Sequence, residues 1–506
     1  MSDSYIKTPS TVTFAELSAN EYRLSSKSYR LIQIANESVE VINSMLACNP
    51  ISGYEVGSLA YVNKSDFYFL RTKAIQDDGF ILDLESNGAL QPIKPIDFTK
   101  TNKTKRGLKY GDILFVTGGN VGSVVFVDKD YPNFVFSSHI LKLNFKKNTF
   151  YTYAFLKHTI SKEQANFAPE GAIKGLDTFK LNFLLDIKIP FPNYNAKNTI
   201  KFIELLTQSI INKEQLIKER HKSILQLIEQ ELLSNQKSNE FKFELPTIKE
   251  IEEVERLDTS LYRKDFKYWN FLVKNYSKGS KDLISRGFTW ARGTSLEQGF
   301  IGTRVDSDKY HKGFYELVLP TNISQYGYVE KSTYIGTPTK LKTIEKGDII
   351  FGGEGFGKGR TYVVVDDSHN VATNYHGIRI INTNQNLTES IFIRCFLAFW
   401  RSKGMIDFIG VGGSGGHCAP SYFRLIETPL FDDTKQKEIA LLYHNPESNY
   451  QTDTFMLDNF LEQDNTFNET AGIYELDKTA KQLKEILNKA IDDIANDKEV
   501  DITLKF

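Results

Sequence analysis

The sequence lacks the features of several protein classes. Only 3 of its 506 residues are cysteine, and Cys48, Cys395 and Cys418 are not clustered, so we expect neither a disulfide framework nor a cysteine-based zinc site. No stretch approaches the ~18 apolar residues that a membrane-spanning helix needs. The first residues, MSDSYIKTPSTVTF, lack the basic and apolar regions of a signal peptide. We therefore expect a cytoplasmic protein without a membrane partner.

Net charge is also nearly absent, because 62 Lys and Arg residues accompany 63 Asp and Glu residues. A formal net charge of -1 argues against general polyanion binding but permits a local basic surface. The composition, 41% apolar and 25% charged, is that of folded protein, and at about 150 residues per domain it predicts two to four domains. The 36 Phe and 25 Tyr favour sheet over base stacking.

Four landmarks occur twice in the same order, with shifts of 233 to 239 residues. The first is Arg-Leu followed five residues later by Tyr-Arg, at Arg23 and again at Arg256. The second is GDILF at Gly111, repeated as GDIIF at Gly347. The third is SSHILKL with His139, repeated as NYHGIRI with His376, and the fourth is Pro190, repeated as Pro429. The segments between them differ. This pattern indicates two copies of one scaffold that carry different recognition surfaces.

Each copy has a sequence pattern typical of β-strands after its GDI landmark, whereas two other segments have helical periodicity. Four isoleucines recur every seventh residue and predict a long helix from about 199 to 235: Ile203, Ile210, Ile217 and Ile224. A second coiled-coil stripe comprises Leu476, Ala480, Leu483, Leu487, Ala490 and Ile494. Basic and acidic residues are balanced along the first helix, which argues against direct DNA contact.

These patterns predict an α+β fold with two mainly β domains in tandem, joined by long coiled-coil helices. The expected parts are a first β domain at 1–192, a central helical spacer at 193–238, a second β domain at 239–430 and a C-terminal helical spacer at 431–506, interrupted near 446–470.

A phosphate-binding loop is suggested by the stretch from Gly352 to Lys358, GGEGFGK, which satisfies GxxxxGK. However, Gly359 stands where that loop needs Ser or Thr, and the following RTYVVVDD is typical of a strand where the motif requires a helix. We therefore interpret the stretch as a Gly-rich turn between two strands, whose backbone amides can approach phosphates.

The other candidates for catalysis are weaker. Cys418 follows His417, but adjacent side chains in extended chain point to opposite faces. His139 and His376 are expected in alternating strands, and Asp112 and Asp348 as turn residues. The sequence contains no HExxH, no CxxC pair and no carboxylate-rich metal loop, and Asn445-Pro446 lacks the surroundings of an amino-methyltransferase motif. We expect no catalytic residue, no metal site and no cofactor of the chain's own.

Candidate DNA-binding residues are basic or polar side chains beside the GDI strands and in the Gly-rich turns. The first copy has a run without acidic residues, KTNKTKRGLK, and the second has fewer basic residues. The candidates are Lys100, Lys103, Lys105, Arg106, Lys109 and Asn120 in the first copy, and Arg292, Arg304, Lys340, Lys342, Lys358 and Arg360 in the second. Arg106, Arg292 and Arg360 are the candidates for bidentate contacts to guanine.

Taken in order, the duplicated landmarks and the helical spacer that follows IPFP resemble the specificity (S) subunits of type I restriction-modification systems, over nearly the whole chain. The resemblance implies two target recognition domains that read a bipartite double-stranded DNA site. It also implies that the helices of the two coiled-coil stripes (Ile203, Ile210, Ile217, Ile224, Leu476, Leu483, Leu487 and Ile494) dock methyltransferase subunits and, through them, a restriction translocase.

By the same resemblance, S-adenosylmethionine, ATP and magnesium would be bound by those partners. The assembled complex would be a type I site-specific deoxyribonuclease and adenine methyltransferase, while this chain itself would be non-catalytic. Two alternatives stay open: a coiled-coil scaffold that binds protein partners in another phage-defence assembly, and a nuclease with an unrecognised site. Salt-dependent binding to a specific duplex, or metal-dependent cleavage, would distinguish them.

Overall fold

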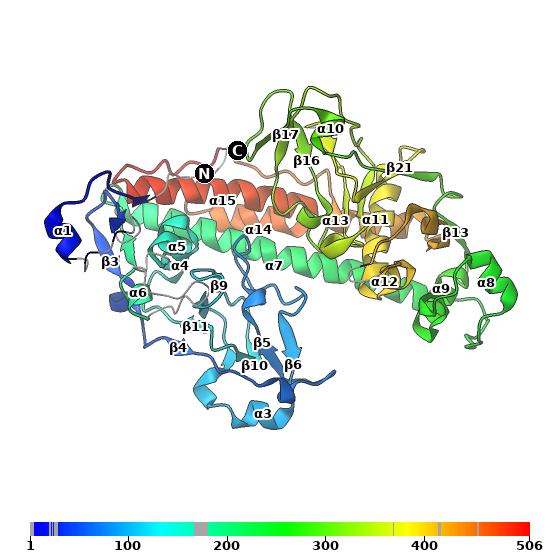
Figure 1. Cartoon of the computed structure of the whole chain (residues 1–506), viewed down its shortest axis with the longest axis horizontal. Helices are drawn as coiled ribbons and strands as arrows, with labels where there is room; N and C mark the ends of the chain where they lie inside the picture. The colour runs from blue at the N-terminus through cyan, green and yellow to red at the C-terminus, as the bar shows by residue number, and fades with distance from the viewer. Residues whose placement is uncertain are drawn as a thin grey trace. The chain divides into compact units, whose positions relative to one another are not determined.

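The computed structural model divides the chain into two compact units (Figure 1). It describes residues 5–19, 22, 24, 29–165, 181–367, 369–412, 416–452 and 455–505, so Arg23 of the first landmark lies outside the described residues. Unit 1 comprises Met1–Gln215, Tyr450–Glu469 and Lys478–Phe506, and unit 2 comprises Leu216–Asn449 and Thr470–Asp477. Because some helices contribute to both units, the four-part organisation inferred from the sequence stays a prediction.

Unit 1 contains two four-stranded sheets. The first is antiparallel and has the order β4-β11-β8-β9: Ile51–Ser52, Ile140–Leu143, Ile113–Val116 and Val124–Phe126. The second has the order β6-β5-β10-β7, with β5 and β10 parallel: Leu90–Pro92, Tyr68–Leu70, Tyr131–Phe136 and Arg106–Leu108. Two strand pairs complete the unit: β1 with β2 (Ile6–Lys7, Leu31–Ile32) and β3 with β12 (Val39–Val41, Lys188–Pro190).

Unit 2 repeats the strand order of the first sheet and part of that of the second, because an isolated bridge between Ile344 and Val371 stands in the place of β7. Its first sheet, β14-β21-β18-β19, is again antiparallel: Phe288–Arg292, Gly377–Asn382, Ile349–Gly352 and Thr361–Val363. Its second sheet has the order β15-β17-β16-β20: Val305–Ser307, Tyr334–Gly336, Tyr315–Leu317 and Val371–Ala372. In this sheet β16 and β20 are parallel, and β15 is an additional edge strand. β13 pairs with β22 (Ser280–Asp282, Glu427–Pro429) as β3 pairs with β12. The internal repeat of the sequence is therefore a repeat of topology.

The central strands are apolar at consecutive positions because both faces of the first sheet are buried. In β8, Leu114 and Val116 belong to the core that also contains side chains of the second sheet. The alternate residues, Ile113 and Phe115, belong to the core shared with the helices. Burial on both faces explains why these strands show no polar alternation. Together with the helices below, the sheets confirm the predicted α+β class.

The GDI landmark has the same structural role in both units. Asp112 Oδ2 accepts a hydrogen bond from the Lys109 amide at 2.8 Å, and Asp348 Oδ2 accepts one from the Glu345 amide at 2.9 Å. Each carboxylate also faces a cation on the neighbouring strand: Lys142 at 3.9 Å from Asp112 and Arg379 at 2.5 Å from Asp348. Burial raises the pKa of Asp348, against the effect of Arg379. The interpretation of both aspartates as turn residues is thus confirmed.

We predict that Asp348→Ala destabilises unit 2 by roughly 3 kcal/mol, because it leaves Arg379 half-buried without its counter-ion. Hydrogen exchange of the β18 amides measures this loss. The matched control is Asp367→Ala, whose carboxylate is exposed and whose removal should change stability by less than about 0.5 kcal/mol. Equal protection of β18 in the two variants would contradict the structural role of Asp348.

Both units also contain helices. Those of unit 1 are α1 (Phe14–Ala19), α2 (Ile42–Met45), α3 (Pro95–Lys100), α4 (Thr149–Lys157), α5 (Thr159–Ala165) and α6 (Leu181–Leu185). Those of unit 2 are α8 (Ile248–Val254), α9 (Lys264–Lys274), α10 (Gln298–Ile301), α11 (Leu387–Ser402), α12 (Met405–Ile409) and α13 (Asp433–Tyr443). α7 (Ala196–Ser234) and α15 (Ile473–Ala495) contribute to both units, and α14 (Phe460–Thr470) falls within the predicted interruption.

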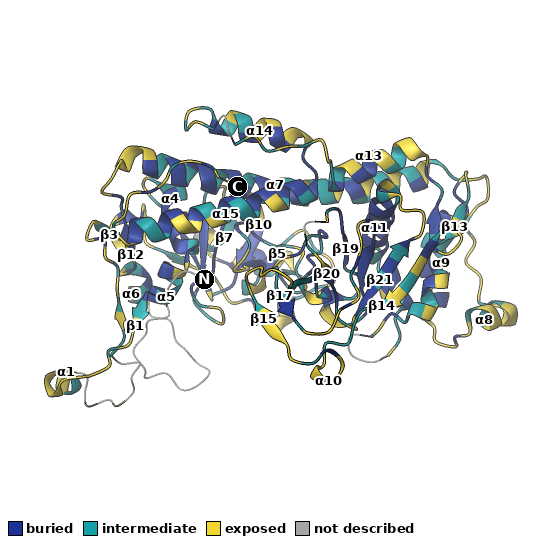
Figure 2. Cartoon of the chain, turned by 90° about the horizontal axis from the view of Figure 1, so that it is seen from above, coloured by how far each residue is buried: buried dark blue, intermediate teal, exposed yellow. Residues whose placement is uncertain are grey.

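The two predicted stripes lie on the buried sides of α7 and α15. Both helices carry buried residues along their length (Figure 2). Ile203, Ile210, Ile217 and Ile224 are at most 3% exposed, and Leu476, Leu483, Leu487 and Ile494 at most 1%. These eight side chains therefore pack within the chain. Docking by the helices that carry them stays a prediction, but a partner would meet their other faces.

α14 is attached to α7 inside unit 1 by a fully buried ion pair. Lys213 and Asp464 have side chains that are 0% exposed, and Lys213 Nζ also donates to Asn468 Oδ1 at 3.0 Å. Asp464 accepts further hydrogen bonds from Ser209 Oγ at 2.7 Å and from the Tyr450 hydroxyl at 2.9 Å. Because the polar atoms satisfy one another, this pair specifies where α14 lies on α7.

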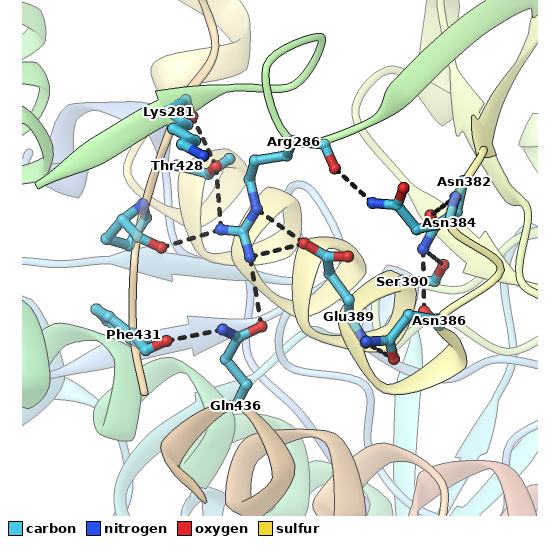
Figure 3. Close-up of polar contacts among 11 residues, drawn as sticks. Lys281, Arg286, Asn382, Asn384, Asn386, Glu389, Ser390, Thr428, Phe431 and Gln436 are labelled. Atoms are coloured by element: carbon cyan, nitrogen blue, oxygen red, sulfur yellow. Dashed lines mark hydrogen bonds and ion pairs between the residues drawn. The ribbon is translucent and has the colours of Figure 1, made fainter. Parts of the chain in front are cut away.

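A second buried network holds the frame of unit 2 together (Figure 3). The Arg286 guanidinium donates to Glu389 of α11 at 3.1 Å, to the Pro429 carbonyl at 3.0 Å and to Gln436 of α13 at 3.3 Å. Asn384 donates to the Arg286 carbonyl at 3.1 Å. A surface hollow is lined by Arg286 among other residues, but each nitrogen of the Arg286 guanidinium already donates a hydrogen bond, so we interpret the network as structural.

Candidate nucleic-acid interface

Equivalent Gly-rich turns follow the GDI strand in both units. Residues 117–123 connect β8 to β9, and residues 353–360 connect β18 to β19. The second turn contains a short 3-10 helix, Gly355–Gly357, and leads directly into a strand. The helix that a phosphate-binding loop requires does not follow, which confirms the interpretation as a turn.

Each Gly-rich turn lies beside a second tight turn, the one that enters β11 or β21. The exposed His139 and His376 occupy these second turns, so their predicted place within strands is wrong. The sequence prediction included His139 in the strand because this residue directly precedes Ile140, the first buried residue of β11. In unit 1 the ring of His139 covers Gly118, where a Cβ would lie 2.4 Å from its Nδ1 atom.

A glycine at the end of a neighbouring strand allows the close packing of these turns. A Cβ on Gly53, after β4, would lie 2.1 Å from the Ser137 carbonyl oxygen. A Cβ on Gly293, after β14, would lie 2.1 Å from the Asn374 carbonyl oxygen. No side chain fits at either place, so both units form the same three-part surface: strand end, tight turn and Gly-rich turn.

In unit 1 this surface includes part of the basic run. Lys105 Nζ donates to the Gly53 carbonyl at 3.1 Å, which connects the run to the strand end. Lys100, Lys103 and Lys109 are exposed in the same run, although Lys109 lies at the turn before β8, where its amide donates to Asp112. The local structure is α3, a 3-10 turn at Lys103–Lys105 and then β7. The exposed lysines of this run can therefore contact phosphates.

Arg106 is held differently. Its Nε atom donates to the Thr101 carbonyl at 2.6 Å, its Nη2 atom donates to the Thr99 carbonyl, and its guanidinium lies 5.4 Å from the centroid of the Phe98 ring. The side chain fastens its own loop, and reading a base would require it to give up these bonds.

Asn120 lies in the Gly-rich turn of unit 1 beside a partly exposed polar cluster around Asp77. Its side-chain amide donates to Asp77 at 2.8 Å, and Ser123 and Lys162 bind the same carboxylate at 2.6 Å and 2.5 Å. Partial burial alone would raise the pKa of Asp77, but hydrogen bonds from Lys162, Ser123 and Asn120 lower it to about 2. The exposed Asn120 is thus presented in a defined orientation.

In unit 2 the equivalent surface carries a polar and aromatic group. The Arg292 guanidinium lies 4.5 Å from the centroid of the Tyr375 ring and 3.6 Å from Glu354. His376 Nδ1 lies 3.2 Å from the other Glu354 oxygen. Arg292 ends β14, and Tyr375 and His376 form the tight turn, so the structure brings together residues that are more than 80 positions apart.

The remaining candidates of unit 2 do not join this group through any contact among the described residues. Lys358 pairs with Asp407 at 2.8 Å, and Arg360 Nη1 donates to the Ile323 carbonyl at 2.7 Å. Arg304 pairs with Asp306 at 2.7 Å. Lys340 and Lys342 are exposed in the segment that leads to β18.

The sequence reasoning missed Phe356, which is 89% exposed in the Gly-rich turn. It also missed Tyr375, which is 51% exposed beside Arg292. The flanking glycines, Gly355-Phe356-Gly357, were a usable signal, because an aromatic residue between two glycines has no neighbouring side chains to cover it.

Cys418, the candidate thiol nucleophile, is buried. Burial raises the pKa of the Cys418 thiol to about 12, so the thiol is protonated at neutral pH. Within the described part of the chain, no cluster of three or more His, Cys, Asp or Glu residues could hold a metal ion. None of the described helices is long and apolar enough to cross a membrane.

We predict that Gly293→Ala separates the strand end from the tight turn and destabilises this region by about 1–3 kcal/mol. The measurement is the exchange protection of the Gly293 and Thr294 amides, which bond to Gly377 and Thr373 at 2.8 Å and 3.0 Å. The matched control is Gly299→Ala in α10, where an added Cβ would meet nothing within 4 Å. Unchanged protection in Gly293→Ala would show that the turn has room for a side chain.

No protein-family model matches the sequence, and no curated protein is significantly similar to it. Among solved structures, the chain is similar to the S subunit of a type I restriction-modification system from M. genitalium: 13% identity over 90% of this chain and 95% of that one, with a TM-score of 0.41. It is also similar to the HsdS subunit from Thermoanaerobacter tengcongensis: 11% identity, 90% and 96% coverage, and a TM-score of 0.27. A third structure, described for the assembly and conformational transition of the type I R-M system, shares 11% identity at 90% and 97% coverage, with a TM-score of 0.26.

Proposed function

We propose that this chain is the DNA-reading specificity subunit of a type I restriction-modification complex. The observation that carries the proposal is the duplicated surface of strand end, tight turn and Gly-rich turn. Its backbone frame is the same in both units, but its side chains differ. Such an arrangement suits a bipartite DNA site whose two halves have different sequences.

The two surfaces differ in the contacts they offer. Unit 1 offers exposed lysines for phosphates and Asn120, whose amide can pair with adenine. Unit 2 offers Arg292 for guanine and Phe356 for a base face or a base step. We therefore assign Lys100, Lys103, Lys105, Lys109, Asn120, Arg292, Lys340 and Lys342 to DNA contact, and give Arg106, Arg304, Lys358 and Arg360 supporting roles in their loops.

The proposal also assigns partners and activities. The chain would act in the cytoplasm, and its helices would dock methyltransferase subunits and, through them, a restriction translocase. S-adenosylmethionine, ATP and magnesium would be bound by those subunits, so the purified chain should show neither ATPase nor methyltransferase activity.

The test begins by mapping the methylated site of the complex reconstituted with its methyltransferase. Arg292→Ala should then relax recognition in one half-site only, by about 1–3 kcal/mol, because a bidentate contact to one base is lost. Asn120→Ala should relax recognition in the other half-site. Binding to duplexes with substitutions in each half measures both effects.

Replacing a residue that contacts phosphate should change binding in a different way from replacing one that reads a base. Lys103→Ala and Lys109→Ala should weaken binding to all duplexes and should each reduce the slope of log affinity against log salt by about 1. Lys505→Ala, whose side chain is 77% exposed, is the control and should leave that slope unchanged. Binding to a protein partner without any salt-dependent, sequence-specific DNA binding would favour the scaffold alternative instead.

A further inference from the structure

The Gly-rich turn of each unit exposes two consecutive residues at its tip. In unit 1 they are Gly119 and Asn120, and in unit 2 they are Gly355 and Phe356. Both glycines have a positive φ, 84° and 61°, and a Cβ on either would meet nothing within 4 Å. Gly355 follows Gly119 by 236 residues, which is also the shift between the two GDI landmarks. Asn120 and Phe356 therefore occupy equivalent positions.

The two tip residues have different chemistry. The Asn120 amide can donate and accept hydrogen bonds at the edge of a base. The phenyl ring of Phe356 has no donor or acceptor, so it can meet DNA only through a thymine methyl group or by entering the stack of bases. Phe356 is 89% exposed, but a single exposed apolar residue is ordinary. The way in which the turn holds the ring distinguishes these possibilities.

The backbone of the unit 2 turn is bonded to itself. The Gly352 amide donates to the Arg360 carbonyl at 2.8 Å, and the Gly359 amide donates to the Gly352 carbonyl at 2.8 Å. The Arg360 amide donates to the Gly357 carbonyl at 3.0 Å. A Cβ on Gly352 would lie 1.9 Å from the Gly357 carbonyl oxygen, so the two sides of the turn are in direct contact. The turn is therefore closed around its own backbone.

The turn is also attached to three other segments of unit 2. Gly357 packs on Pro320, because a Cβ at this glycine would lie 2.5 Å from the Pro320 carbonyl oxygen. The Gly353 amide donates to the His376 carbonyl at 2.9 Å. The Gly353 carbonyl accepts a hydrogen bond from the Cys418 amide at 2.7 Å. These contacts fix the turn on both sides of its tip.

Three basic side chains fix the part of the turn that follows the tip. Lys358 pairs with Asp407 at 2.8 Å, and Arg360 Nη1 donates to the Ile323 carbonyl at 2.7 Å. Arg401 Nε donates to the Lys358 carbonyl at 3.2 Å. A ring that separates stacked bases must be held in this way, because a mobile loop would move before the bases did. Such preorganisation also lowers the entropy lost on binding.

The neighbours of the tip place it beside a base-reading group. Glu354 directly precedes the tip and lies 3.6 Å from Arg292, which stacks on Tyr375. A ring that enters the base stack would thus do so next to the guanine contact assigned to Arg292. Burial of a phenyl ring recovers free energy of the same order as the cost of unstacking one base step. That cost is lowest at flexible pyrimidine–purine steps.

We propose that Phe356 is a wedge that enters a pyrimidine–purine step and kinks the duplex in the half-site that unit 2 reads. The proposal rests on the proposed function and deepens it by a DNA-bending activity. The Asn120 tip of unit 1 cannot act in this way, so only one half of the site is kinked. One half is then read by hydrogen bonds alone, and the other is read in part by its deformability.

The experiment uses the full chain and a duplex that it selects from a random-sequence pool. Fluorophores at both ends of the duplex report bending, and 2-aminopurine at the purine of the step reports unstacking. The wild-type chain should bend the duplex by about 20–90° and unstack the step. Phe356→Ala should abolish both signals and weaken binding roughly tenfold to a hundredfold. Phe356→Leu should keep most of the bend, because leucine also acts as a wedge.

Three controls separate the wedge from other contacts. A stiffer step at the same place should weaken binding by the wild-type chain but not by Phe356→Ala. Arg292→Ala should relax the choice of one base and retain the bend. Phe300→Ala in α10, where the side chain is 69% exposed, should change neither the bend nor the affinity. The Phe356 and Phe300 variants should melt at the wild-type temperature, since both side chains are exposed.

The outcomes distinguish this inference from the proposed function. Specific binding without a bend, or a bend that persists in Phe356→Ala, would overturn the wedge and leave the proposed function supported. A Phe356-dependent loss of affinity when thymine is replaced by deoxyuridine, without bending, would make Phe356 a methyl contact and also overturn the wedge. If Phe356→Ala instead keeps the bend and loses a protein partner, the wedge is likewise refuted. A chain that selects no duplex would refute the proposed function and the wedge together.

Discussion

A buried carboxylate at the start of the central strand organises each half of this protein. Asp112 and Asp348 bind an amide of the turn that precedes their strand and face a cation on the adjacent strand, Lys142 or Arg379. In this way the turn, β8 or β18, and β11 or β21 are held in one register. The Gly-rich turn at the far end of the central strand and the tight turn before its neighbour are consequently brought together in both units. A buried charge that is left without its partner is strongly unfavourable, so this arrangement tolerates little change.

The frame and the surface it presents follow different physical requirements. The frame needs burial on both sheet faces, a glycine where Gly53 or Gly293 crosses a turn, and the charged pair just described. None of these constrains the side chains that the turns project into solvent. Asn120 can therefore stand in one unit where an arginine, tyrosine and phenylalanine group occurs in the other, without any change in topology. Function in such a molecule resides in the loops, while the duplicated sheets position them.

The buried ion pair of Lys213 with Asp464 and the network around Arg286 make the two units unequal. Each fixes one helix to its own unit, α14 onto α7 in unit 1 and α13 beside β22 in unit 2. Burial lowers the pKa of Lys213, although the adjacent Asp464 opposes this effect. Both networks satisfy their polar atoms internally, so they specify geometry and offer no groups to a ligand.

The sequence by itself determined the class of fold, the internal repeat, the long helix at Ala196–Ser234 and its buried isoleucines, and the turn character of Gly352 to Lys358. These depend on local periodicity and on residues with narrow conformational preferences, which a single chain reveals directly. Only the tertiary structure decided which candidates share a surface. It placed Arg292 beside Tyr375 and Glu354, tied Arg106 and Arg360 to carbonyls of their own unit, moved the two histidines from strands into turns, and left Leu257 exposed beside a buried Arg256. The reason is that side-chain exposure and pairing depend on strand pairing, which joins distant residues such as Arg292 and Tyr375, and on loop geometry, as at Arg106. Neither leaves a periodic signal in the sequence.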